Sequence, residues 1–169
     1  MKKNYFKHSF LTINVKSLIV NIKTCKKMFL VENKIAEDVM NISIKENIEV
    51  IIEKNHGFLI VYTSNFEKLR SLLLKLPRVL LCEPVIICEE KDMKNEAVKT
   101  AKDVLREGDE FALSVHKKGQ SNVLEPKIAD AIFENIDTIK VNLKNPDKEL
   151  NIRISETEKA YLYWKYRKL

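Results

Sequence analysis

Short β-branched runs alternate with amphipathic helical stripes in the first half of the chain, and this alternation constrains the fold more than any other feature. The runs have the length and composition of strands, and the stripes have apolar residues at helical spacing. In order, we predict strand 17–23, helix 31–40, strands 48–53 and 58–63, helix 66–76 and an interrupted strand 79–88. The order is βαββαβ, so we predict a ferredoxin-like domain.

Local signals support these boundaries. Asn55 and Gly57 tolerate positive φ, so residues 54–57 suit the turn of a hairpin. Asn65 can cap the helix that follows it, and Pro77 can end that helix.

The second half also mixes helices and strands. A run of four charges, residues 89–92, marks the boundary that we predict between domain 1–90, with its basic amino-terminal extension, and domain 91–169. Gly108 is expected to end the first helix of the second domain, and Pro126 is expected in the first turn of the next one. The predicted elements are a helix from Met93 to Leu105, strand 111–115, a helix that starts near Pro126, strand 139–144, a turn at 145–148, strand 150–154 and strand 160–166. The predicted fold class is α+β.

Composition excludes several classes of protein. The chain has 169 residues, is 45% apolar and contains only three Gly, so it is neither collagen-like nor wholly disordered. No apolar run approaches the roughly 18 residues of a membrane-spanning helix, and no secretory signal follows the basic start. Cys25, Cys82 and Cys88 form no CxxC pair and fit buried thiols in a reducing compartment. We therefore expect a cytoplasmic protein that makes no contact with a membrane.

The excess of positive charge lies at the ends of the chain. The formal net charge is +6, and residues 1–27 carry seven Lys and no acidic residue. Basic ends on a balanced body suit a polyphosphate partner. They also suit a chain that needs lysines only for solubility, and charge alone does not separate these interpretations.

Catalytic motifs are absent from the sequence. There is no GxGxxG, P-loop, HExxH or GxSxG motif. His8, His56 and His116 lie far apart and lack partners at metal-ligand spacing, and Cys82 and Cys88 lie in an apolar run. We expect no catalytic residue, cofactor or metal, and we interpret His116, beside two lysines, as a phosphate contact rather than a general base.

Residues 93–166 resemble a THUMP domain, a tRNA-binding module attached to several RNA-modifying enzymes. The resemblance rests on the strand 111–115 followed by basic residues, Ser121 before a helix, and the segment Val141-Asn142-Leu143-Lys144-Asn145-Pro146-Asp147, which is similar to the family's V-D-L-x-N-P-D turn. Asn142 departs from the acidic residue common there. Lys also replaces the usual Arg after the first strand, which keeps the charge but loses the bidentate fork.

This resemblance implies a function. THUMP proteins usually carry a ferredoxin-like domain before the THUMP domain, and this chain is similar to stand-alone proteins that assist a tRNA cytidine acetyltransferase. It implies tRNA binding without catalysis, through the acceptor stem and its unpaired three-prime end, and a separate modifying enzyme as partner. Two alternatives stay open: a non-catalytic subunit of a split thiouridine synthase or methyltransferase, and a protein–protein interaction module.

Seven residues of the second domain are candidate RNA contacts. Six are cations predicted on polar faces, where several phosphate contacts give salt-sensitive and sequence-tolerant affinity, and the seventh is the serine of the resemblance. They are Lys117, Lys118, Ser121, Lys127, Lys140, Lys144 and Arg153. Four aromatic residues of the last strand could stack on bases, although core positions are more usual for such residues. These are Tyr161, Tyr163, Trp164 and Tyr166.

Overall fold

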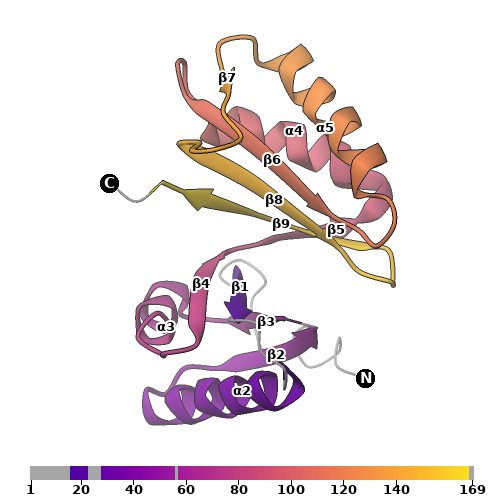
Figure 1. Ribbon diagram of the computed structural model, residues 1–169. Coiled ribbons are helices and arrows are strands. Elements are labelled where there is room, and N and C mark those ends of the chain that lie inside the picture. Colours follow the sequence, from indigo (N-terminus) through magenta and orange to yellow (C-terminus); the bar gives the residue numbers. More distant parts are fainter. Residues whose placement is uncertain (1–15, 23–27, 56, 168–169) are drawn as a thin grey trace. The chain divides into compact units, whose positions relative to one another are not determined.

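The computed structural model describes residues 16–22, 28–55 and 57–167, and the chain divides into two compact units, Met1–Val85 and Ile86–Leu169. Within these described residues, each unit contains one sheet and two α-helices (Figure 1). The fold class is α+β, as predicted. His8, Cys25 and His56 lie outside the described residues, as does most of the basic amino-terminal region.

The first unit has the predicted ferredoxin-like order. Its elements are β1 (Lys16–Ile22), α2 (Met28–Lys45), β2 (Val50–Asn55), β3 (Phe58–Thr63), α3 (Phe66–Leu73) and β4 (Val79–Pro84). The sheet order is β2-β3-β1-β4, and every neighbouring pair is antiparallel. The two helices pack on the sheet through a buried apolar cluster. Its members are Ile35, Val39, Ile48, Leu59, Val61, Leu69, Leu73 and Cys82.

The helix cap and the hairpin turn predicted in the first unit are confirmed. Asn65 caps α3, because its side-chain oxygen accepts a hydrogen bond from the backbone N–H of Lys68 at 3.3 Å. Gly57 has a φ of 84° in the turn between β2 and β3. The buried Glu32 of α2 accepts the N–H of Gly57 at 2.6 Å, a contact that sequence reasoning missed.

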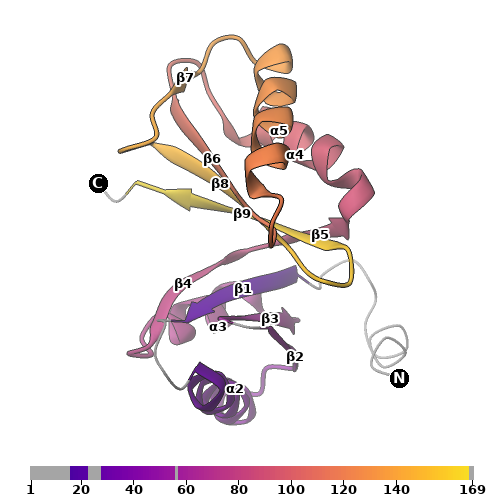
Figure 2. The same cartoon turned by 45° about the vertical axis from the view of Figure 1, so that its right-hand side comes forward.

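The second unit is a five-stranded sheet with both helices on one face (Figures 1 and 2). Its elements are β5 (Ile86–Glu89), the short 3-10 helix η1 (Glu90–Asp92), α4 (Met93–Val104), β6 (Glu110–His116), α5 (Ser121–Asn135), β7 (Lys140–Val141), β8 (Lys148–Ile154) and β9 (Lys159–Tyr166). The sheet order is β5-β9-β8-β6-β7, with β6 parallel to β7 and β8 and the other pairs antiparallel.

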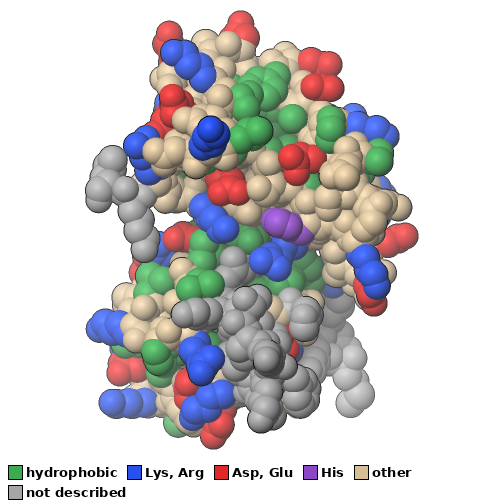
Figure 3. Space-filling model, in the orientation of Figure 1, with side chains coloured by type: hydrophobic (Ala, Val, Ile, Leu, Met, Phe, Trp, Pro, Cys, Tyr) green, Lys and Arg blue, Asp and Glu red, His purple; other side chains and the backbone are tan. Residues whose placement is uncertain are grey.

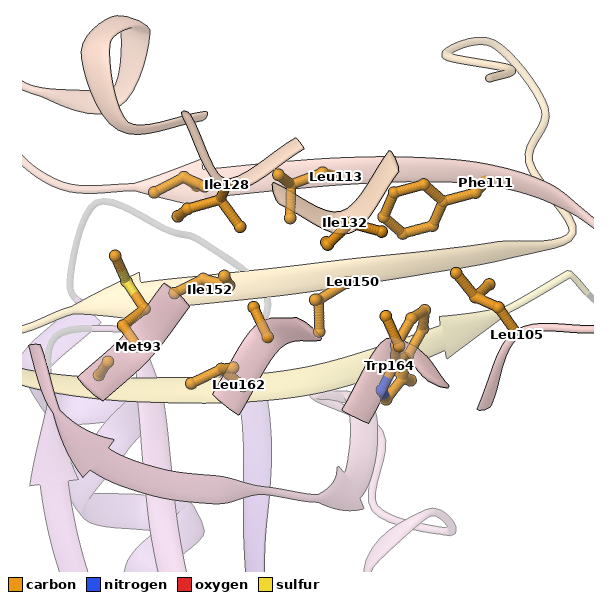
Figure 4. Packing of buried hydrophobic residues seen from close by; sticks show 14 of the residues in the cluster. Met93, Leu105, Phe111, Leu113, Ile128, Ile132, Leu150, Ile152, Leu162 and Trp164 are labelled. Carbon is orange, nitrogen blue, oxygen red and sulfur yellow. The ribbon is translucent and has the colours of Figure 1, made fainter. Parts of the chain in front are cut away.

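An apolar core fills the space between this sheet and its helices (Figure 4). Phe111 contacts two other aromatic rings, with centroids 6.2 Å from Phe133 and 6.1 Å from Trp164. The indole N–H of Trp164 donates to the Thr100 hydroxyl at 2.9 Å, so its polar group is satisfied inside the core. The aliphatic side chains labelled in Figure 4 come from both layers: Met93, Leu105, Leu113, Ile128, Ile132, Leu150, Ile152 and Leu162.

The predicted last strand of the first unit, 79–88, is wrong in its second half. Residues 79–84 form β4 of the first sheet, whereas Ile86–Glu89 pair with β9 of the second sheet. The sequence could not show this, because the edge of β9 that receives them lies more than seventy residues later in the chain. The two units accordingly divide between Val85 and Ile86, while the predicted boundary lay between residues 90 and 91.

Three element boundaries in the second unit also differ from prediction. α4 ends at Val104, because Leu105 is already extended, and Gly108 lies in the turn beyond it. α5 begins at Ser121, so Pro126 lies inside the helix, where it cannot donate to the carbonyl one turn back and its ring crowds that carbonyl. Residues 139–144 form a strand only at Lys140–Val141.

We predict that Phe111→Ala destabilises the second unit by about 3–5 kcal/mol, because it leaves a cavity beside Phe133 and Trp164. The chain has one Trp, and Trp164 lies in this core, so its fluorescence during urea unfolding reports on this unit. Leu143→Ala, at a side chain 76% exposed, should change the free energy of unfolding by no more than about 0.5 kcal/mol. Equal effects of the two substitutions on the free energy of unfolding would contradict the placement of Phe111 in this core.

Candidate nucleic-acid interface

The structure does not bring the seven predicted RNA contacts into one patch. Lys117, Lys118 and Ser121 follow the end of β6, whereas Lys140 pairs with the start of β6 and Lys144 lies just beyond. Six residue steps of extended chain separate the two ends of this strand, which is about 20 Å. Two groups of candidates therefore occupy opposite ends of β6.

Ser121 holds the loop between β6 and α5. Its hydroxyl accepts the backbone N–H of Lys117 and donates to the carbonyl oxygen of Lys117, each at 3.0 Å. Gly119, with a φ of 76°, completes the reversal of the chain. The Ser121 hydroxyl thus has a structural role at the first residue of α5.

Lys117 is an ion-pair partner inside the protein. Its ammonium group pairs with the carboxylate of Glu90, and both side chains are largely buried. Next to Glu90, an open hollow of about 410 Å³ is lined by Glu89, Glu90, Lys91 and Glu158. Three carboxylates there disfavour a phosphate group, so Lys117 is poorly placed for RNA.

Lys118 and Lys127 present their charges to solvent. Both residues are exposed, and no ion pair in the described part of the chain involves them. Lys118 lies in the loop before α5, and Lys127 lies six residues into that helix, about 9 Å along its axis from Ser121. The start of α5 also contributes backbone N–H groups and the positive end of the helix dipole.

The turn at residues 142–147, which carries the strongest part of the family resemblance, has a structural role. Asp147 accepts the backbone N–H of Glu110 at 3.0 Å and donates its own N–H to the Glu110 carbonyl at 2.8 Å. The ammonium group of Lys148 bonds Asp109 at 2.7 Å and the carbonyl of Val104 at 2.9 Å. These contacts fix the start of β6 beside the turn.

Asn142 has a similar structural role in this turn. Its amide N–H donates to the Glu110 carboxylate at 2.7 Å, and its amide oxygen accepts the N–H groups of Lys144 and Asn145 at 3.1 and 3.0 Å. An acidic residue at this position would face Glu110. Asn142, which replaces the acidic residue common in the family, can therefore donate to Glu110, which an acidic residue would repel.

Arg153 and His116 lie side by side on neighbouring strands, on the sheet face away from the helices. The Nε–H of Arg153 donates to the Tyr163 hydroxyl at 3.2 Å. Partial burial, with Arg153 and Lys165 nearby, lowers the pKa of His116 against the opposing effects of Glu149 and Glu125. The imidazole is therefore mostly neutral at pH 7 and offers little charge to a phosphate.

Three of the four aromatic residues of β9 are core residues. Tyr161, Tyr163 and Trp164 are buried, whereas Tyr166 is 52% exposed. This agrees with the more usual reading of aromatic residues in a closing strand.

Charge divides unevenly between the units. Residues 86–169 contain 16 Lys and Arg and 16 Asp and Glu, so the whole excess of +6 belongs to residues 1–85. Over the face drawn in Figure 3, basic and acidic side chains are interleaved. Phosphate contacts by the second unit must therefore depend on local placement of cations, because its net charge supplies no general attraction.

The two cysteines among the described residues have raised pKa values. Burial raises the pKa of Cys82 to about 12, and burial with nearby carboxylates raises that of Cys88 to about 11, so both thiols are protonated near neutral pH. Among the described residues, no group of His, Cys, Asp and Glu is placed to hold a metal ion. No helix in the same ranges combines the length and apolarity needed to cross a membrane.

A comparison with family models identifies the second unit. Residues 89–165 match the model of the THUMP domain. This segment is a THUMP domain. The match covers both helices and every strand of the sheet except most of β5, and it includes the Asn142–Asp147 turn, so the resemblance drawn from that turn is confirmed.

Solved structures share the fold across both units. PH1313 from Pyrococcus horikoshii aligns with a TM-score of 0.72 and 24% identity, over 90% of this chain and 55% of that protein. A 4-thiouridine synthetase in complex with RNA and ATP aligns with a TM-score of 0.63 and 16% identity, over 91% of this chain and 42% of that one. TrmN from Thermus thermophilus aligns with a TM-score of 0.56 and 14% identity, over 89% and 46%.

These similarities extend the fold assignment to the first unit. The alignments cover about nine-tenths of this chain, so the folds of the two units occur together in other proteins. This chain spans about half the length of those structures. No curated protein sequence matches it.

We predict that Asn142→Asp, which introduces the common family residue, destabilises the THUMP domain by about 1–3 kcal/mol. The change removes the donor to Glu110 and places two carboxylates within hydrogen-bond distance. Urea unfolding followed by Trp164 fluorescence measures the loss. Adding Glu110→Gln should restore most of the stability, because the amide introduced at position 110 can donate a hydrogen bond to the carboxylate introduced at position 142. A double variant as unstable as Asn142→Asp alone would contradict this account.

We predict slow alkylation of Cys82 in the folded protein. A pKa of about 12 leaves on the order of one thiolate in 10⁴ at pH 8, and the side chain is buried. Iodoacetamide labelling at pH 8, quantified by mass spectrometry with and without urea, checks this. Equal rates in the two conditions would show that β4 does not protect the thiol.

Proposed function

We propose that this chain binds tRNA through its THUMP domain and presents it in the cytoplasm to a separate tRNA-modifying enzyme, with a cytidine acetyltransferase as first choice. The observation that carries the proposal is the THUMP domain at residues 89–165, joined to a ferredoxin-like unit. Two proteins that share this pair of folds, the 4-thiouridine synthetase bound to RNA and TrmN, add support.

Lys118 and Lys127 are the residues we propose as phosphate contacts. Both are exposed; Lys118 lies in the loop before α5, and Lys127 lies six residues into that helix. A helix of this length adds backbone donors and a positive dipole end to the two ammonium groups. The combination suits the backbone of a folded RNA, which proteins recognise by shape and by unpaired ends. The resemblance to other THUMP proteins favours the acceptor stem and three-prime end.

We propose further that the chain has no catalytic activity of its own. Cys82 and Cys88 are protonated thiols near neutral pH, and His116 contacts no assembled acid–base partner among the described residues. Incubation of the purified chain with tRNA and acetyl-CoA plus ATP, or with S-adenosylmethionine, should leave every nucleoside unchanged by mass spectrometry. Turnover by the lone chain would contradict this part of the proposal.

We predict that Lys118→Glu with Lys127→Glu weakens tRNA binding at least about tenfold at 0.1 M salt. Two phosphate contacts become repulsive, and the slope of log affinity against log salt should fall by about 1.5, at 0.7–0.9 for each contact. Filter binding across a salt series measures both quantities. Reversal at Lys117 is a poor test, since it places a carboxylate beside Glu90 and strains the loop.

The matched control is Lys99→Glu with Lys102→Glu, two exposed lysines of α4 in the same domain. It changes the net charge by the same amount, so it should alter tRNA affinity less than about twofold. An equal loss from both pairs would mean that the phosphates respond to the net charge of the domain and no specific surface exists.

A further inference from the structure

A small apolar surface lies at the end of the THUMP domain opposite Lys118. Val141 and Leu143 are 56% and 76% exposed, and Lys140 and Lys144, which flank them, are also exposed. We call these four residues the β7 surface. Between the two apolar residues, Asn142 turns its side chain inward to Glu110, which leaves Val141 and Leu143 together on the outside.

The backbone at the β7 surface has an unused strand edge. β7 is the last strand of the sheet order, and within the described residues it pairs only with β6. The N–H groups of Lys140 and Asn142 donate to the carbonyls of Asp109 and Phe111 of the β6 side, each at 3.0 Å. Since backbone groups alternate along a strand, the N–H and C=O of Val141 point to the outer edge.

These features suit an extended polypeptide better than RNA. Aliphatic side chains provide no flat face for base stacking, and burying Val141 and Leu143 against phosphates would gain nothing. An extended segment beside β7 would gain main-chain hydrogen bonds, apolar contacts with Val141 and Leu143, and ion pairs with Lys140 and Lys144. Such a segment would carry apolar side chains with acidic neighbours.

We propose that the β7 surface docks the modifying enzyme, through an extended segment of that protein with apolar and acidic side chains. This rests on the function proposed above and assigns Lys140 and Lys144 to a protein partner instead of RNA. The site lies about 20 Å along β6 from the loop that holds Lys118, at the opposite end of that strand.

The test separates RNA binding from partner docking by two readouts. Val141→Asp with Leu143→Asp is introduced into the full chain. The affinity of the purified variant for tRNA is measured by filter binding. The same variant replaces the natural protein in cells, and modified nucleosides of total tRNA are quantified by mass spectrometry. The nucleoside to be scored is the one lost from cells without this protein.

We expect tRNA affinity to change less than about twofold and the modified nucleoside to fall at least about tenfold, as for loss of a docking hot spot. Lys140→Glu with Lys144→Glu should give the same pattern, since acidic neighbours of the docked segment would be repelled. Val141→Ile with Leu143→Met keeps the apolar surface and should retain modification. Trp164 fluorescence confirms that each variant is folded.

Three results would overturn the inference. A tenfold loss of tRNA affinity in either charged variant would make the β7 surface an RNA contact. Full modification in cells with Val141→Asp and Leu143→Asp would show that nothing docks there. If cells without the protein lose no nucleoside, or the unaltered chain fails to bind tRNA, the proposed function fails and the docking role with it.

Discussion

The reciprocal hydrogen bonds between Asp147 and the backbone of Glu110 are the constraint on which the second sheet depends. They fix the start of β6 against the turn that leads into β8, and so set the register of the two central parallel strands. Lys148 adds a bridge to Asp109 and to the end of α4. In this chain, the turn that carries the family resemblance therefore acts through its geometry. Asp147 and Lys148 use their charged groups for contacts within the protein.

Much of the fold could be predicted because its signals are local. The cap at Asn65, the turn at Gly57 and the continuous run of apolar residues in β3 each depend on neighbouring residues. Residues 85–88 could not be placed, since their apolar pattern suits either sheet and the choice depends on a distant strand, β9. The start of α5 was predicted wrongly for a related reason. The preference of proline for the first turn of a helix suggests a start near Pro126, but the hydrogen bonds between Ser121 and the backbone of Lys117 let the helix begin at Ser121.

The candidate site was harder to predict than the fold. Sequence marks where lysines are, but the partner of each ammonium group depends on tertiary structure. Lys117 meets Glu90, which is 27 residues away in the chain, and no local pattern announces that pair. Lys118, its neighbour, is exposed. Adjacent lysines therefore have different roles, and only the three-dimensional arrangement separates them.

Strand β5 has a practical consequence for dividing the chain. The family match begins at residue 89, yet Ile86, Ile87 and Cys88 already belong to the THUMP sheet as partners of β9. A fragment cut at the start of the match would remove nearly all of this strand and expose the β9 edge. Unpaired strand edges are templates for aggregation. An isolated THUMP domain from this chain should therefore begin at or before Ile86, where the second unit begins.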